Sequence, residues 1–322
     1  MSAGPGGGAV SSGTASGGQS NLALSRGETD RSTARRSDTA WLDRAWADPA
    51  TRVLAVEEGK ALVRSAEGGA ELVFVSPAEA PAGVRFLLGV DAGGVVYFGV
   101  AGPLPAPPGD QVPGSEVRPV SLREAGPLLS DRDAGLMTEA VALGNWHALH
   151  GHCPRCGAVT VPELAGHARR CVADGSEHFP RIDPAVIMLV TDPDDRCLLA
   201  RNAMWPERRV SILAGFVEPG ESAEQAVARE VHEETAITVG EVRYVGSQPW
   251  PMPHSLMLGF RAQAAGSLEI RVDSEEIAEA RWFSRDELRA SIATGEIRLP
   301  PPVSIAHRII ESWYGAPLQG AW

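Results

Sequence analysis

Acidic side chains recur at helical spacing in residues 215–237, GFVEPGESAEQAVAREVHEETAI. A capping box of the S-x-x-Q type at Ser222 predicts that a helix starts there. Glu230 and Glu234 then lie one turn apart with Glu233 beside them, so three carboxylates share one face. Like charges this close repel, and a hard divalent cation such as Mg²⁺ or Mn²⁺ would remove the conflict because it prefers oxygen ligands. The alternative is a solvated acidic face, but the flanking glycines and arginine favour a metal site.

The same stretch resembles the Nudix box, G-x5-E-x7-R-E-U-x-E-E-x-G-U, in which U is aliphatic. Ala236 departs from this pattern, which has Gly at that position to end the helix in a left-handed conformation. Alanine adopts that conformation at a cost of about 1 kcal/mol, so we expect an altered helix end and an intact metal site. The matching residues are Gly215, Glu221, Arg229, Glu230, Val231, Glu233, Glu234 and Ile237.

Nudix enzymes hydrolyse nucleoside diphosphates linked to another group, and the resemblance implies the same chemistry here. Divalent ions would cancel the charge of the diphosphate and orient an attacking water. Glu233 is the candidate for orienting or deprotonating that water, and a structural salt bridge with Arg229 is its alternative role. The implied catalytic residues are Glu233, Glu230, Glu234 and Arg229. The implied metal ligands are the carbonyl of Ala214 and the side chains of Glu230, Glu234, Glu276 and Glu221, with Glu275 as a close competitor of Glu276.

A second motif, SQPWPMPHS at residues 247–255, narrows the expected substrate. Its three prolines predict a stiff, extended segment that holds Trp250 at a fixed position, although a proline-rich connector with its Trp in the core is the alternative. The segment is similar to SQPWPFPxS, the signature of the NADH pyrophosphatase family, and the resemblance runs from about Leu122 to the C-terminus. It implies hydrolysis of NAD(H) to nicotinamide mononucleotide and AMP. The substrate-binding candidates are Gln248, Pro249, Trp250, Pro251, Met252, Pro253, His254, Ser255, Phe216, Phe179, Arg123 and Ala306.

Three clustered cysteines predict a ribbon that could hold zinc. Cys153 and Cys156 form a CxxC pair, but the second pair is broken because Asp174 stands where the family usually has a cysteine after Cys171. Asp174 or His178 would then be the fourth ligand of a structural Zn²⁺, and a metal-free ribbon with reduced thiols is the alternative. Cys197 lies in a predicted strand and is expected to fill the core.

Composition and periodicity predict a soluble α+β protein with several units. A disordered Gly/Ser-rich tail is expected over 1–38, a small α+β domain over 39–150, a zinc-ribbon-like motif over 151–180 and a Nudix domain over 181–322. The last is expected to be an α/β/α sandwich around a mixed sheet. In the second unit, residues 84–90 and 94–100 predict a β-hairpin, and residues 131–150 predict a helix.

The net charge and the cysteine content narrow the expected binding partners and the expected cellular location. The net charge of −12 is unfavourable for general nucleic-acid binding. An NAD-capped RNA end would carry the same scissile bond as NAD and could be held by stacking, so it stays an expected substrate beside NAD(H). No membrane span or signal peptide is evident, and reduced cysteines suit a cytoplasmic protein. The family resemblance implies a homodimer, and the competing functions are hydrolysis of ADP-ribose and a non-catalytic nucleotide-binding module.

Overall fold

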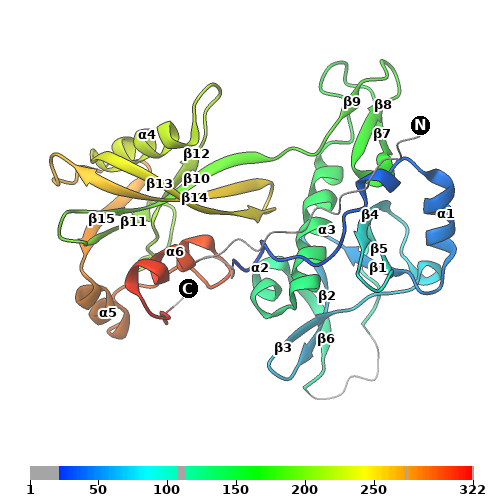
Figure 1. Ribbon diagram of the computed structural model, residues 1–322, viewed down its shortest axis with the longest axis horizontal. Helices are drawn as coiled ribbons and strands as arrows, with labels where there is room; N and C mark the ends of the chain where they lie inside the picture. The colour runs from blue at the N-terminus through cyan, green and yellow to red at the C-terminus, as the bar shows by residue number, and fades with distance from the viewer. Residues whose placement is uncertain (1–21, 108–113, 273, 321–322) are drawn as a thin grey trace, which may run out of the picture.

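The computed structural model describes residues 22–107, 114–272 and 274–320, which form two lobes (Figure 1). The N-terminal lobe contains α1 (Thr39–Ala47), β1 (Arg52–Val56), β2 (Lys60–Ala66), β3 (Gly69–Leu72), β4 (Val84–Val90), β5 (Val96–Ala101), β6 (Val117–Ser121), α2 (Leu122–Ala125) and α3 (Asp131–Leu149). The ribbon contains β7 (Thr160–Glu163), β8 (Ala168–Cys171) and β9 (Glu177–His178). The C-terminal lobe contains β10 (Asp183–Thr191), β11 (Cys197–Asn202), β12 (Leu213–Phe216), α4 (Ala223–Thr235), β13 (Thr238–Trp250), β14 (Ser255–Ala265), β15 (Ile277–Phe283), α5 (Arg285–Ala293) and α6 (Ile305–Tyr314).

Helix α3 is the centre of the N-terminal lobe. Ser130 caps it by accepting a hydrogen bond from the backbone N–H of Asp133, and Leu136 and Met137 are fully buried between two small sheets, β1-β5-β4 and β3-β2-β6. The predicted hairpin is confirmed, because β4 and β5 pair antiparallel. The predicted helix is confirmed as α3.

The sheet of the C-terminal lobe has the order β13-β14-β10-β11-β15, with β12 paired to β10. It is mixed, because β10 and β14 run parallel while β12 and β13 pair antiparallel with their neighbours. Along β10 the side chains alternate between faces: Val186 packs in the core with α4, and Ile187 packs in the core with α6. Helices therefore cover both faces of the sheet, as the predicted α/β/α sandwich requires (Figure 1).

The SQPWPMPHS segment is not extended throughout, contrary to the prediction. Strand β13 ends at Trp250 and β14 begins at Ser255, so residues 251–254 close a hairpin. Trp250 and Met252 pack against the core of the N-terminal lobe, and Asn145 of α3 donates a hydrogen bond to the carbonyl of Pro251 (2.8 Å). One function of the N-terminal lobe is therefore to hold the end of this hairpin.

The predicted disordered tail is wrong for residues 22–38. Residues 1–21 lie outside the described residues, but Leu22 and Leu24 are buried, and a short 3₁₀ helix spans Thr33–Arg35. Two leucines among small polar residues carry no periodicity, and their partners lie far away in the sequence. Local composition therefore could not reveal this packing.

Glu139, on the buried side of α3, should make stability depend on pH. Its carboxylate lies 3.3 Å from the guanidinium of Arg31, and burial raises the pKa of Glu139 from 4.5 to about 7. The folded protein then holds a proton that the unfolded chain releases. The free energy of unfolding should therefore fall by up to about 3 kcal/mol as the pH rises from 4.5 to 7.

The change Glu139→Gln should remove this part of the pH dependence. Urea denaturation at pH 5 and pH 8 measures it, with Glu224→Gln on the exposed face of α4 as the control. A variant with the same loss of stability between the two pH values as wild type would contradict the prediction.

Candidate functional site

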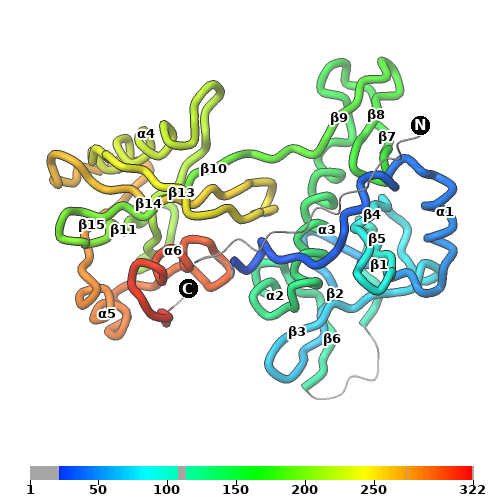
Figure 2. Tube along the Cα trace, in the orientation of Figure 1, coloured from blue at the N-terminus to red at the C-terminus, as the bar shows by residue number. Residues whose placement is uncertain are grey.

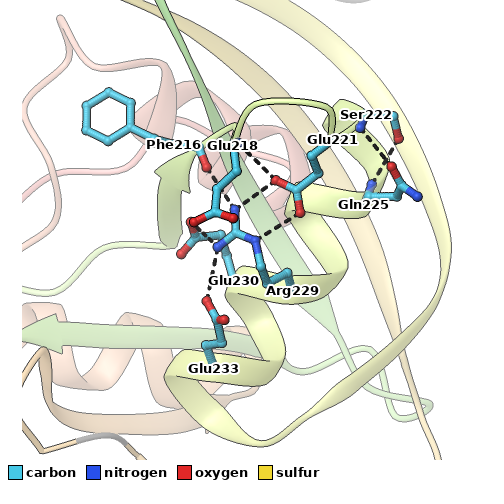
Figure 3. Close-up of polar contacts among 8 residues, drawn as sticks. All are labelled: Phe216, Glu218, Glu221, Ser222, Gln225, Arg229, Glu230 and Glu233. Carbon is cyan, nitrogen blue, oxygen red and sulfur yellow. Dashed lines mark hydrogen bonds and ion pairs between the residues drawn. The ribbon is translucent and has the colours of Figure 1, made fainter.

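Arg229 lies at the centre of the acidic cluster on α4 (Figure 3). Its Nε and Nη2 donate to the two carboxylate oxygens of Glu221 (both 2.9 Å), and its Nη1 donates to Glu230 (2.8 Å) and Glu233 (3.0 Å). Nη2 also donates to the carbonyl of Phe216 (2.9 Å), the last residue of β12. The guanidinium therefore ties the loop before α4 to the helix and fixes where the carboxylates stand.

Local sequence explains this helix and its start. Ser222 accepts from the backbone N–H of Gln225, whose side chain accepts in turn from the backbone N–H of Ser222, so the predicted capping box is confirmed. Ala236 follows the helix with φ 59° and ψ 10°, the left-handed conformation that glycine usually adopts there, so the expected alteration of the helix end is not found. The cluster thus sits on a helix with both ends defined.

Glu230 packs directly on the backbone of β12. A Cβ added to Gly215 would overlap the carboxylate carbon and both oxygens of Glu230. Burial raises the pKa of Glu230, while its hydrogen bond with Arg229 acts in the opposite direction. Gly215 therefore leaves the space that the Glu230 carboxylate fills, and this close approach brings the carboxylate against the strand that carries Ala214.

Glu234 has the least favourable surroundings for a negative charge among the acids of the cluster. It is 5% exposed, and its Oε2 is buried with no hydrogen-bond partner among the described residues. Burial, followed by the charges of Glu230, Glu276 and Glu233, raises the pKa of Glu234 to about 8. An ionised carboxylate here needs a positive partner that these neighbours do not supply.

These features fit a hard divalent cation. The buried oxygen of Glu234 has no protein donor, the carboxylate of Glu230 lies against a strand without a side chain at Gly215, and Glu276 is close enough to raise the pKa of both glutamates. Oxygen donors of this kind suit Mg²⁺ or Mn²⁺. A cation at this place would also lower the repulsion among the carboxylates.

Two acids with predicted roles, Glu221 and Glu233, contact Arg229 in the structure. Glu221 was expected among the metal ligands, but Arg229 engages both of its oxygens, so its observed role is to hold that arginine. Glu233 makes the alternative contact, the salt bridge with Arg229, while 60% of its side chain remains exposed. Its role toward water stays a prediction.

The hairpin segment lines a groove of about 250 Å³ against α3 and the chain that enters β10. Glu139, Leu143 and Ile182 form part of the opposite wall. The motif residues in the lining are Pro249, Pro251, Pro253, His254 and Ser255.

Sequence reasoning missed Asp183, the first residue of β10. It lies 3.2 Å from Nδ1 of His254 and accepts two hydrogen bonds from Arg181 (2.8 and 2.7 Å). The R-x-D spacing before a predicted strand was the available signal, because alternate residues of an extended chain lie on one side.

Four residues that were predicted to bind substrate contact other parts of the protein instead. Gln248 is fully buried, with its Oε1 accepting from the N–H of Leu24 (3.4 Å) and its Nε2 donating to the carbonyl of Val303 (2.9 Å). Trp250 packs on the N-terminal core, and the guanidinium of Arg123 lies 5.3 Å from its ring centre. Ala306, in the first turn of α6, is buried. Met252 shares the surroundings of Trp250. All four were predicted to touch substrate, but Gln248, Trp250 and Met252 contact residues of the N-terminal part of the chain, and Ala306 lies in the core of the C-terminal lobe.

Two predicted aromatic contacts remain available to a ligand. Phe216 is 57% exposed and Phe179 is 61% exposed. The ring of Phe216 projects away from the carboxylates, while its carbonyl accepts from Arg229 (Figure 3). Exposed aromatic rings suit a ligand with planar bases, and of the two only Phe216 contacts the carboxylate cluster, through its carbonyl.

The cysteine motif closes into one cluster. The candidate ligand atoms of Cys153, Cys156, Cys171 and Asp174 all lie within 4.8 Å of one another. The sulfurs of Cys156 and Cys171 are 3.4 Å apart, and the ring of His178 contacts Ser176 (3.1 Å). A Cys₃Asp set fits tetrahedral Zn²⁺, and the clustered ligand atoms include Asp174 but not His178.

Zinc content should respond to the fourth ligand. We expect Asp174→Ala to lower the zinc content of the purified protein strongly, and His178→Ala to leave it near wild type. Elemental analysis by mass spectrometry measures both variants. Equal zinc content in wild type and Asp174→Ala would contradict the assignment, whereas Asp174→Cys should retain the metal.

Three family models cover most of the described chain. A NUDIX domain matches residues 181–301, an NADH pyrophosphatase zinc ribbon domain matches residues 148–179, and an NADH pyrophosphatase-like rudimentary NUDIX domain matches residues 50–146. The "NAD-capped RNA hydrolase NudC" of Mycobacterium bovis is 51% identical over 202 residues, which cover 60% of this chain and 64% of that protein. The human "NAD-capped RNA hydrolase NUDT12" is 42% identical over 197 residues, which cover 58% of this chain and 42% of that protein. The chain thus spans less than two thirds of the length of these curated relatives.

The mixed sheet, the capped helix α4 and its carboxylates define a Nudix protein. The ribbon and the rudimentary NUDIX domain both match models of NADH pyrophosphatase domains, so the chain is similar to NADH pyrophosphatases in all parts that the three models cover.

Within the described ranges, each helix is too short or too polar to span a bilayer.

Proposed function

We propose that this protein hydrolyses the diphosphate bond of NAD(H), giving nicotinamide mononucleotide and AMP, and that it removes NAD caps from RNA 5′ ends. The observation that carries the proposal is the buried Glu234 carboxylate, which has an oxygen without a partner and lies near Glu230 and Glu276. The substrate assignment is supported by the two matches to NADH pyrophosphatase domain models and by the names of the relatives.

Each residue of the cluster has a defined task in this proposal. Glu230 and Glu234, with the carbonyl of Ala214 and the carboxylate of Glu276, would hold Mg²⁺ or Mn²⁺. The bound cation would supply neutralisation of the diphosphate charge and orientation of a water. Arg229 keeps the carboxylates in place, and the exposed Glu233 is the proposed residue for accepting the water's proton.

The bases would bind outside the carboxylate cluster. Phe216 and Phe179 are proposed to stack on the rings of the dinucleotide, because both rings are exposed. Pro249 to Ser255 would contribute through the groove against α3 rather than through Trp250. We further propose a homodimer, in which exposed apolar residues such as Ile182 are covered, and a cytoplasmic location, which free cysteines suit.

A test of this function compares products across related substrates. The purified protein with Mg²⁺ or Mn²⁺ is incubated with NADH, NAD⁺, ADP-ribose and an NAD-capped RNA, and products are identified by mass spectrometry. The proposal expects AMP and nicotinamide mononucleotide from the dinucleotides and a 5′-monophosphate RNA from the capped transcript. Turnover of ADP-ribose comparable to that of NADH would reject the substrate assignment, and absence of all turnover would favour a nucleotide-binding module.

A further inference from the structure

Residues 22–31, here called the strap, cross from one lobe to the other (Figure 2). Leu22 is buried in the core that α6 shares with the sheet of the C-terminal lobe. Leu24, two residues later, is buried in the core of the N-terminal lobe. The strap therefore contributes an apolar side chain to each of two separate cores.

The strap is hydrogen-bonded to β13, at the start of the SQPWPMPHS segment. The hydroxyl of Ser25 donates to the carbonyl of Ser247 (2.8 Å), and the N–H of Leu24 donates to Oε1 of Gln248 (3.4 Å). The other end of the Gln248 amide donates to the carbonyl of Val303. The first two residues of the segment are thus held from the side of the strap.

Arg26 fixes the strap to the N-terminal lobe. Its guanidinium donates to the carbonyl of Gly126 (2.6 Å) and to the carboxylate of Asp131 (2.9 Å), and 17% of its side chain is exposed. The backbone there passes so close to α3 that a Cβ on Gly135 would lie 2.7 Å from the carbonyl oxygen of Arg26. Further along, Asp30 and Val90 exchange two backbone hydrogen bonds (2.9 and 2.8 Å), which add the strap to the edge of β4.

We propose that Ser25 and Arg26 are positioning residues for substrate binding: through the strap they hold residues 247–255 at a fixed place against α3. This inference rests on the proposed function, because the groove formed there is where part of the substrate is proposed to bind. Arg26 acts through the strap backbone, and Ser25 acts through the carbonyl of Ser247. The carboxylates on α4 make no contact with the strap among the interactions described above, so binding should change more than turnover.

Kinetic constants separate this role from general stabilisation. We expect Arg26→Ala to raise the KM for NADH about tenfold and Ser25→Ala about threefold, with kcat within about twofold of wild type. Ser25→Thr keeps the hydroxyl and should restore the wild-type KM. Arg35→Ala is the matched control, because its ion pair with Asp38 (3.7 Å) stays within the N-terminal segment.

Hydrogen exchange supplies a second readout that needs no turnover. In Arg26→Ala and Ser25→Ala, amides in the peptide 247–255 should exchange faster, while those of the helix 223–235 should exchange as in wild type. The proposal requires both the KM change and the faster exchange, and an unchanged value of either in both variants overturns it. If Arg26→Ala does not fold, the Ser25→Ala variant alone tests the proposal. Ser25 is exposed and the substitution removes a single hydrogen bond, so this variant is expected to fold. Absence of NADH hydrolysis by wild type would count against the proposed function alone, and the exchange rates would still decide whether the strap holds the segment.

Discussion

Glu234→Gln is expected to lower kcat for NADH by about 10³-fold or more, which corresponds to about 4 kcal/mol of lost transition-state stabilisation. The amide keeps the shape of the side chain but removes the negative charge that would hold the cation. The measurement is the initial rate of AMP formation across a range of Mg²⁺ concentrations. Glu224→Gln, an exposed change in the first turn of the same helix, is the matched control and should retain wild-type rates.

The same substitution should raise the stability of metal-free protein at alkaline pH. Burial raises the pKa of Glu234 from 4.5 to about 8, so the folded wild type holds a proton that the unfolded chain has lost. Its stability therefore falls as the pH rises from 4.5 to about 8, and the Gln variant lacks this loss. Thermal melts in chelator at pH 6 and pH 9 measure this effect. The melting temperature of the variant relative to that of wild type should be higher at pH 9 than at pH 6. Saturating Mg²⁺ should reverse the order, because a ligand stabilises the form that binds it. A variant with full activity and a wild-type pH profile would remove Glu234 from the metal site.

Gly215→Ala is expected to reduce activity by about 10²-fold or more while changing stability much less. The added methyl group would occupy the place of the Glu230 carboxylate, which must then move away from β12. Displacing one ligand should raise the Mg²⁺ concentration needed for half-maximal rate as well as lower the maximal rate.

Gly240→Ala is a fair control for this change. It adds the same methyl group to β13, where the nearest atom would be 3.7 Å away on Ala265, an ordinary contact. Mg²⁺ titrations of the hydrolysis rate, with circular dichroism melts on both variants, make the comparison. Wild-type Mg²⁺ dependence in Gly215→Ala would mean that the position of the Glu230 carboxylate does not matter for the reaction.

The predictable parts of this protein are those whose signals are local. The capping box at Ser222 depends on neighbours within a few residues, and the sequence predicts it. The altered helix end expected at Ala236 is wrong, because the alanine adopts the left-handed conformation that glycine usually provides. The contacts of Gln248 and Trp250 do not follow from local pattern, because their partners, Leu24, Val303 and Arg123, are distant in the chain. A family motif marks such residues as important but does not say whether they touch a ligand or another part of the protein.

The carboxylate cluster illustrates the same limit. Spacing alone brings Glu230, Glu233 and Glu234 to one region of a helix, but it does not rank them. The structure separates a buried Glu234 from an exposed Glu233, and it shows Glu221 engaged at both oxygens by Arg229. Burial depends on β12 and the residues before β15, whose positions only the folded sheet defines.

Trp250 and Met252 pack against the core of the other lobe, and this packing affects how the protein unfolds. A chain cut before β10 would leave these side chains in water and would open the N-terminal core where Val303 also fills it. We therefore expect that neither half folds stably by itself, although the chain forms two lobes. The whole polypeptide should melt in a single cooperative transition rather than in two steps.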